Sequence, residues 1–208
     1  MLHPRQRYMF WLLAAFLAIG LVYPVIGLSA LICMLAPLIV ATTKGRYWCG
    51  NFCPRGSFYD NVAAKFSPQK PIPAFFRRKS WRLFMIGLIM FMFTVQLYFA
   101  WGDLKALGSV FIRLILITTL AGLILALFFH QRTWCAFCPI GTLASWLSKD
   151  KQPLTVAEGC VNCKLCTKVC PLQLSPHTAK GGTFTDPDCL KCGRCVARCP
   201  RQVLSFKY

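Results

Sequence analysis

The sequence predicts a chain of two parts. Residues 1–154 are expected to form an all-α membrane bundle of four transmembrane helices, and residues 155–208 a small α+β domain. Three observations support this division. Of the 208 residues, 56% are hydrophobic and only 14% are charged, which is too apolar for an ordinary soluble domain. The long apolar runs all lie before residue 130, and eight of the 13 cysteines follow residue 159.

The first part is expected to cross the membrane four times. Residues 8–42 contain no charged residue. As one helix this run would extend about 52 Å, well beyond a hydrocarbon core of about 30 Å, so we expect a break near Pro24. The first helix is interpreted as uncleaved rather than as a signal peptide. The predicted spans cover residues 8–23, 25–42, 82–101 and 108–129.

The distribution of charge predicts the orientation of the chain. It has 24 Lys and Arg against six Asp and Glu, a net charge of +18. Eight basic residues in 43–80 stand against Asp60 alone, whereas 102–107 holds one residue of each sign. Because basic loops face the cytoplasm, both termini and the cysteine-rich domain are expected on the cytoplasmic side of a prokaryotic inner membrane. Basic residues placed beside membrane spans do not predict a nucleic-acid partner.

The cysteines of the second part form two copies of the run C-x2-C-x2-C-x3-C-P. Bacterial ferredoxins bind two 4Fe–4S clusters with this run, and its fourth cysteine ligates the other cluster. The predicted ligand sets are Cys160, Cys163, Cys166 and Cys199 for the first cluster, and Cys189, Cys192, Cys195 and Cys170 for the second. Structural zinc usually takes two separated C-x2-C pairs, so zinc and disulfides are the weaker alternatives. The second part is therefore predicted to be a ferredoxin-like domain with two 4Fe–4S clusters.

The membrane part contains a repeat of the form R-x-W-C-x2–3-C-P-x-G-[ST]. One copy runs from Arg46 to Ser57 and the other from Arg132 to Thr142. Each copy follows a pair of predicted spans, so the bundle is interpreted as two duplicated hairpins with both copies on one face of the membrane. Four thiols are then expected to converge, and four are what a 4Fe–4S cluster requires. A third iron–sulfur cluster is therefore predicted on Cys49, Cys53, Cys135 and Cys138.

Three alternatives to a third cluster stay open. Each cysteine pair could be a thiol–disulfide switch, the four could hold zinc, or they could form a structural corner without metal. No catalytic residue is predicted, because the spans contain no Asp or Glu relay and a carboxylate pair for hydrolysis is improbable. His130 is interpreted as an interfacial histidine, with a contact to a quinone head group as the alternative.

Together these motifs resemble the NapH/MauN-type membrane-bound 4Fe–4S ferredoxin-like (polyferredoxin) family. The resemblance rests on the two ferredoxin runs and on the C-x3-C-P and C-x2-C-P loops of the membrane part. It implies a four-helix membrane subunit that passes electrons between the quinone pool, cytoplasmic carriers and a partner oxidoreductase. Compared with such proteins, this chain is expected to be compact, without an additional soluble domain.

The predicted function is that of an integral-membrane electron-transfer subunit. It would relay single electrons between a cytoplasmic carrier and a membrane-edge cluster, the quinone pool or a partner oxidoreductase. Expected partners are membrane lipid, other subunits of a redox complex, and an acidic ferredoxin- or flavodoxin-like carrier. Five basic residues beside the clusters would suit an acidic partner or anionic lipid: Lys164, Lys168, Lys191, Arg194 and Arg198. The alternatives are a quinol dehydrogenase in its own right, a redox-sensing or maturation factor for a metalloenzyme, and a structural anchor.

Overall fold

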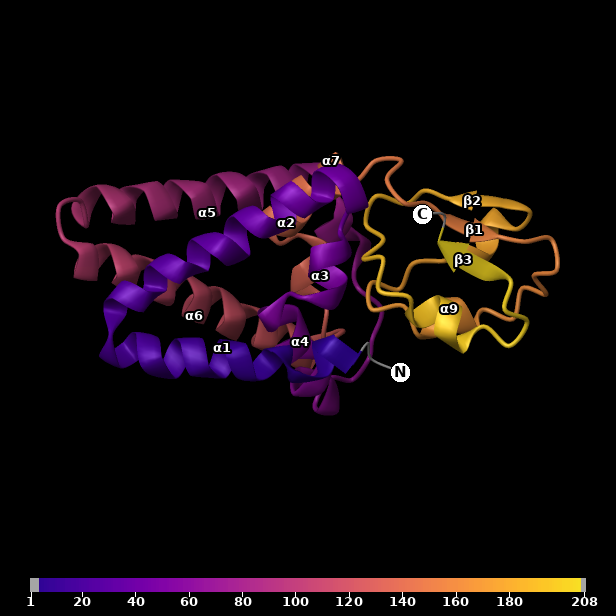
Figure 1. Cartoon of the computed structure of the whole chain (residues 1–208), viewed down its shortest axis with the longest axis horizontal. Helices are drawn as coiled ribbons and strands as arrows, with labels where there is room; N and C mark the ends of the chain where they lie inside the picture. Colours follow the sequence, from indigo (N-terminus) through magenta and orange to yellow (C-terminus); the bar gives the residue numbers. More distant parts are fainter. Residues whose placement is uncertain (1–3, 207–208) are drawn as a thin grey trace.

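The computed structural model describes residues 4–206 as an elongated helical bundle with a small β-containing part at one end (Figure 1). The long helices of the bundle are α1 (Pro4–Val22), α2 (Ala30–Lys44), α5 (Lys79–Phe99) and α6 (Leu104–Phe128). The described chain begins at the end of the bundle next to the β-containing part and ends within that part (Figure 1). Residues 1–3 and 207–208 lie outside the description.

Three helical segments are long and apolar enough to cross a membrane: Pro24–Lys44, Lys79–Phe99 and Leu104–Phe128. A shorter apolar helix covers Gln6–Val22. Large apolar side chains such as Trp11, Ile39 and Phe91 are more than 60% exposed on these helices, as expected of a surface that contacts lipid. The prediction of a mostly helical fold with apolar helices is confirmed, and the fourth crossing stays a prediction.

The turns between the long helices follow from particular residues. A 3-10 helix, η1 (Pro24–Ser29), begins at the predicted break and joins α1 to α2. At the other turn, Asp103 caps α6 by accepting a hydrogen bond from the Lys105 backbone N–H at 2.8 Å. The η1 segment then packs directly on α6, where a Cβ on Gly27 would lie 2.0 Å from the Gly108 carbonyl oxygen. Small residues permit such close backbone approach, and this contact brings the two hairpins together.

Short helices carry the two repeat motifs at the end of the bundle. They are α3 (Tyr47–Asn51), α4 (Pro54–Asn61), η4 (Trp134–Ala136) and α7 (Pro139–Leu147). The second cysteine of each copy is the N-cap of α4 or α7, and a proline follows at the first helical position. Proline suits this position because its fixed φ matches the helix and its missing N–H is not needed there. The repeat therefore places its cysteines where short helices begin.

The β-containing part is a three-stranded antiparallel sheet with two short helices. Its elements are β1 (Leu154–Val156), β2 (Gly182–Phe184), β3 (Leu204–Phe206), η5 (Pro176–Ala179), α8 (Leu165–Lys168) and α9 (Arg194–Arg198). The strand order is β2-β1-β3, and Leu154 lies opposite both Phe184 and Phe206. Residues with positive φ recur 29 positions apart as Asn162 and Lys191, Lys164 and Gly193, and Gln173 and Gln202. The backbones of the two cysteine runs therefore adopt similar conformations at equivalent positions.

The segment between α4 and α5 is largely irregular and crosses the end of the bundle. It contains the 3-10 helices η2 (Ala63–Lys65) and η3 (Ala74–Arg77). Its Ile72 is buried, and the Ile72 backbone N–H donates to Gln173 Oε1 at 2.8 Å. This segment therefore helps to hold the β-containing part against the bundle.

Candidate metal centres

The predicted ligands of the second cluster line one cavity. Cys170, Cys189, Cys192 and Cys195 share its wall with apolar side chains that include Leu174, Leu190, Phe184 and Phe206. Lys191 and Gly193, on either side of Cys192, have φ of 52° and 71°. Backbone turns of this kind form concave N–H surfaces that suit an anionic group. Four thiols around an apolar cavity fit a buried 4Fe–4S cluster, whose core takes four cysteine ligands.

Burial raises the pKa values of two of these thiols. It raises the pKa of Cys170 to about 12 and also raises the pKa of Cys195. Without iron the thiols of Cys170 and Cys195 are therefore neutral at pH 7, and binding of iron must release their protons. Among residues 4–206, no three His, Cys, Asp or Glu side chains lie close enough to hold one metal ion.

The predicted ligands of the first cluster surround the core of the sheet. Cys166 is buried, and Cys160 and Cys199 pack against the same apolar side chains. Cys163 is exposed. The fold thus gathers three of the four around one core and leaves Cys163 at the surface. The ligand assignment stays a prediction.

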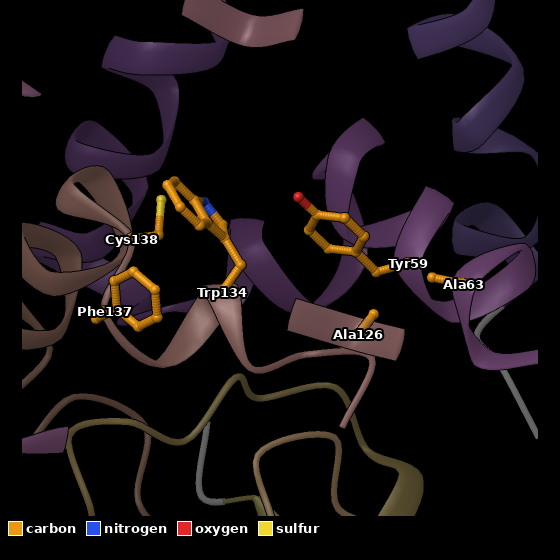
Figure 2. Close-up of a cluster of buried hydrophobic side chains, with 6 residues drawn as sticks. All are labelled: Tyr59, Ala63, Ala126, Trp134, Phe137 and Cys138. Atoms are coloured by element: carbon orange, nitrogen blue, oxygen red, sulfur yellow. The ribbon is translucent and has the colours of Figure 1, made fainter. Parts of the chain in front are cut away.

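The four cysteines of the repeat come together at the end of the bundle, and we call them the edge site. Burial raises the pKa of Cys49 to about 12; Arg46 opposes this shift, while the thiols of Cys53, Cys138 and Cys135 add to it. Cys49 of the first repeat and Cys135 of the second pack against the same apolar core. Figure 2 shows Cys138 beside Trp134 and Phe137 in a buried apolar cluster. Cysteines of both repeats therefore lie at this end of the bundle, and their ligation of a third cluster stays a prediction.

The arginine that opens each repeat reaches into the other repeat. Arg46 and Arg132 are only 2% and 1% exposed. Arg46 Nη2 donates to the Cys135 carbonyl oxygen at 3.0 Å, and Arg132 Nη1 donates to the Cys49 carbonyl oxygen at 3.4 Å. A Cβ on Gly141 would lie 2.7 Å from Arg46 Nη2, and one on Gly56 would lie 2.4 Å from Arg132 Nη1. Each motif glycine makes room for the arginine of the other copy.

This role was not predicted from the sequence. Arg46 and Arg132 were recognised as the first residues of the repeat, and Arg46 as a basic loop residue that indicates orientation, but neither was given an internal partner. The signal was present in the repeat, since arginine and glycine recur in both copies at fixed places. A basic residue kept beside a cysteine pair in two copies indicates an internal partner as readily as a membrane orientation.

Each of these arginines belongs to a buried Arg–Asp–Arg group. Arg132 binds Asp60 through two hydrogen bonds of 2.9 and 2.8 Å, and Arg194 also pairs with Asp60. Burial alone would raise the pKa of Asp60, but the two arginines lower it below its usual value. Asp60 is therefore a carboxylate at neutral pH and balances part of the buried positive charge.

Asp188 plays the same part for Arg46. It accepts from Arg46 Nη1 at 3.0 Å, from both Nη atoms of Arg82, and from Ser145 Oγ at 2.9 Å. Its pKa is also lowered, because the arginines outweigh the opposing effect of burial. Asp188 directly precedes Cys189, and Arg194 lies within the same cysteine run. The two Arg–Asp–Arg groups therefore fasten the second cysteine run to the bundle.

This contact corrects the expected docking surface. Lys191 is only 5% exposed, and Arg194 pairs with Asp60 and donates to Gln6 Oε1 at 3.1 Å. Both residues face the bundle and are not free to meet another protein. Lys164, Lys168 and Arg198 remain exposed.

The edge site and the second cysteine run also share an apolar core. Ile72, Ala136, Leu172, Leu174 and Leu190 form it. Cysteines from both sites pack against this core: Cys49 and Cys135 from the edge site, and Cys170, Cys189 and Cys192 from the second run. A Cβ on Gly50 would lie 2.2 Å from the Leu190 carbonyl oxygen and 3.1 Å from Cys192 Cβ. The two sites are therefore adjacent.

His130 lies inside the protein and not at an interface with lipid. It is 6% exposed, and its Nδ1 accepts a hydrogen bond from the Arg132 backbone N–H at 3.3 Å. Burial lowers its pKa to about 4, so the ring is neutral at pH 7. His130 lines a cavity together with Gln69, Arg77 and Lys168. The prediction of an interfacial histidine is corrected accordingly.

Family models match both cysteine-containing regions of the chain. The family described as "4Fe-4S binding domain" matches residues 26–82 and 112–155, which contain the two repeats, and "4Fe-4S dicluster domain" matches residues 159–204. An uncharacterised protein of Methanocaldococcus jannaschii is 26% identical over 203 residues, covering 88% of this chain and 81% of that protein. No solved structure matches significantly.

Two relatives have informative names. The ferredoxin-type protein NapH of Escherichia coli is 35% identical over 102 residues, covering 40% of this chain and 34% of that protein. The delta subunit of the NADH-dependent phenylglyoxylate dehydrogenase of Aromatoleum evansii is 31% identical over 71 residues, covering 31% of this chain and 74% of that subunit. The fold and sites define an iron–sulfur protein of the ferredoxin type with a role in electron transfer. The two 4Fe–4S domains and the partial match to NapH support the NapH-type, polyferredoxin-like family that the motifs predicted.

Proposed function

We propose that this chain is a membrane-spanning electron relay with three iron–sulfur clusters in series. The observation that carries the proposal is the apolar core shared by the edge site and the second cysteine run. When bound, a 4Fe–4S cluster takes up and releases one electron at a time. The residues of this chain hold two such sites next to each other and keep water from the space between them.

The order of the sites follows from which cysteines share a core. The core around Cys160, Cys166 and Cys199 is built from residues 154–206, and Cys195 of the second set packs against it. The second set in turn meets the edge site through Leu190 and its neighbours. The sequence of sites is therefore first run, second run, edge site, with the exposed Cys163 at the outer end.

The outer end is the proposed place of exchange with a soluble carrier. Cys163 and the neighbouring Val161 are exposed, and the exposed Lys164, Lys168 and Arg198 give this end a positive charge. Positive charge attracts an acidic partner and speeds its association. The Aromatoleum relative is named as a dehydrogenase subunit, which supports a place for this chain in a larger redox complex.

The membrane position belongs to the same proposal. We place four crossings along α1, α2, α5 and α6, with the β-containing part on the cytoplasmic side. The apolar exposed faces of these helices support this placement, as does the basic segment before α5. Direct reaction with a quinone stays a prediction from the sequence alone.

Iron analysis of the purified chain tests the proposal. We expect about twelve irons and about twelve acid-labile sulfides per chain, since each 4Fe–4S cluster contains four of each. Replacing Cys49 and Cys135 together by serine should remove about four irons and leave the EPR signals of two clusters. Cys33→Ser, an exposed cysteine of α2, serves as the matched control and should change nothing. About eight irons in the unmodified chain would overturn the third cluster.

A further inference from the structure

Arg55 stands out at the edge site because its positive charge has no carboxylate partner within residues 4–206. Its Nη2 donates to Cys138 Sγ at 3.2 Å, and its Nη1 donates to Thr118 Oγ1 at 2.8 Å. The guanidinium carbon lies 5.7 Å from the centre of the Trp134 ring. The sulfur is thus the one contact among these that could carry a full negative charge.

The other arginines of the edge site are balanced differently. Arg46 pairs with Asp188, and Arg132 pairs with Asp60. A cation that is largely removed from water is unfavourable unless an anion compensates it. A hydroxyl group and an aromatic face compensate it only in part. The surroundings of Arg55 therefore call for an anionic group on the sulfur side.

The architecture of the loop does not explain Arg55. It follows Cys53 and Pro54, and the equivalent residue of the second repeat, after Cys138 and Pro139, is Ile140. Both loops nevertheless start a short helix in the same way. An aliphatic residue is thus sufficient to start such a helix, so the helix start does not account for the arginine.

We propose that Arg55 holds the Cys138 sulfur in place and raises the reduction potential of the edge-site cluster. This inference rests on the third cluster proposed above. Four thiolates make the cluster site anionic, and one more electron makes it more so. A positive charge and an N–H donor at a ligand sulfur both stabilise the reduced form, because hydrogen bonds and net charge tune these potentials. The edge site is thereby made a better electron acceptor than its four sulfurs alone would make it.

Redox titration of the whole protein in detergent, followed by EPR, tests this assignment. Arg55→Met removes both charge and donor, and we expect the equilibrium constant for reduction of the edge-site cluster to fall at least tenfold, which is 59 mV for one electron. Arg55→Gln keeps N–H donors without the charge and should show a smaller fall, and Arg55→Lys should stay nearest to the original. Arg78→Gln removes an exposed charge and is the matched control, which should leave the potential unchanged.

The outcomes separate this inference from the proposed function. An unchanged potential in Arg55→Met, with the full iron content retained, would overturn the role of Arg55 and leave the third cluster standing. Absence of a third EPR signal in the unmodified protein would instead overturn the proposed function. If Arg55→Met loses the cluster, Arg55→Gln and Arg55→Lys decide in the same way: equal potentials in these two variants and the unmodified chain would refute the inference.

Discussion

The two repeats of the bundle share a motif but obtain their carboxylate from different places. In the first repeat, Asp60 follows the second cysteine by seven residues and binds Arg132. The equivalent residue of the second repeat is Ser145, which donates to Asp188 of the β-containing part. The first repeat therefore carries its own carboxylate, whereas the carboxylate beside the second repeat comes from the β-containing part.

This difference makes docking part of the architecture of the edge site. Arg46 and Ser145 find their charged partner only when Asp188 is in place, and Asp188 is joined to Cys189. The β-containing part thus supplies the carboxylate that the second repeat lacks. In turn, the contacts to Asp188 orient the second cysteine run. The second repeat therefore depends on the β-containing part for its carboxylate, and this dependence links the two parts of the chain.

The largest expected effect comes from removing the more buried carboxylate. Asp60→Asn would leave Arg132 and Arg194 without a counter-charge in a site where the Asp60 side chain is 2% exposed. Breaking a buried ion pair destabilises by about 3–5 kcal/mol. Asp188 is 14% exposed, so Asp188→Asn should lose less, about 1.5–3 kcal/mol for charged hydrogen bonds. Thermal unfolding in detergent measures both, and equal losses would contradict the asymmetry between the repeats.

Alanine substitution of the motif glycines tests the feature that the two repeats share, which is the space that each glycine leaves for the arginine of the other repeat. A Cβ at Gly56 or Gly141 would enter the space of a guanidinium that is fixed by an aspartate. Overpacking of this kind lowers stability by about 1–3 kcal/mol, and the iron content of the edge site should fall with it. Gly87→Ala in α5 is the control, since a Cβ there meets nothing within 4 Å. Similar stability of all three variants would show that the arginines have room to move.

Acid should weaken both Arg–Asp–Arg groups. The folded chain holds the pKa values of Asp60 and Asp188 below their ordinary value, which is about 3.9 for an unfolded chain. Their contribution to stability is therefore present above that pH and is lost as the pH falls toward the folded pKa. The difference in unfolding temperature between the unmodified chain and Asp60→Asn should narrow below about pH 4. A constant difference from pH 7 to 3, or the same narrowing with the exposed Asp150→Asn, would argue against this cause.

The smallest effect is expected at Ser145. Ser145→Ala removes one hydrogen bond to Asp188 and leaves Arg46 and Arg82 in contact with that carboxylate. The loss should be about 0.5–1.5 kcal/mol, the usual contribution of one hydrogen bond. Chemical unfolding of the whole chain would detect it. A loss as large as that of Asp188→Asn would mean that the Ser145 hydroxyl, and not the arginines, holds the β-containing part against the bundle.

The sequence was most informative where spacing alone carries the chemistry. Two ferredoxin runs and a repeated cysteine pair identify the family and the electron-transfer role, because cysteines of one run that bind the same cluster must lie a few residues apart along the chain. Apolar runs likewise predicted the long helices, since a membrane demands length and hydrophobicity. The roles of Arg46, Arg132 and Asp60 were not predicted, because their partners lie 72 to 142 residues away along the chain.

The sequence by itself predicted which cysteines form sets, and it determined that apolar helices precede them. Only the tertiary structure decided that Lys191 and Arg194 face the bundle and that Asp188 completes the second repeat. The physical reason is that ligand spacing and hydropathy act along the chain, whereas a buried charge is stable only beside an opposite charge that folding brings to it. A net charge of +18 shows an excess of positive charge. The fold determines which of these charges are paired inside the protein and which remain at the surface.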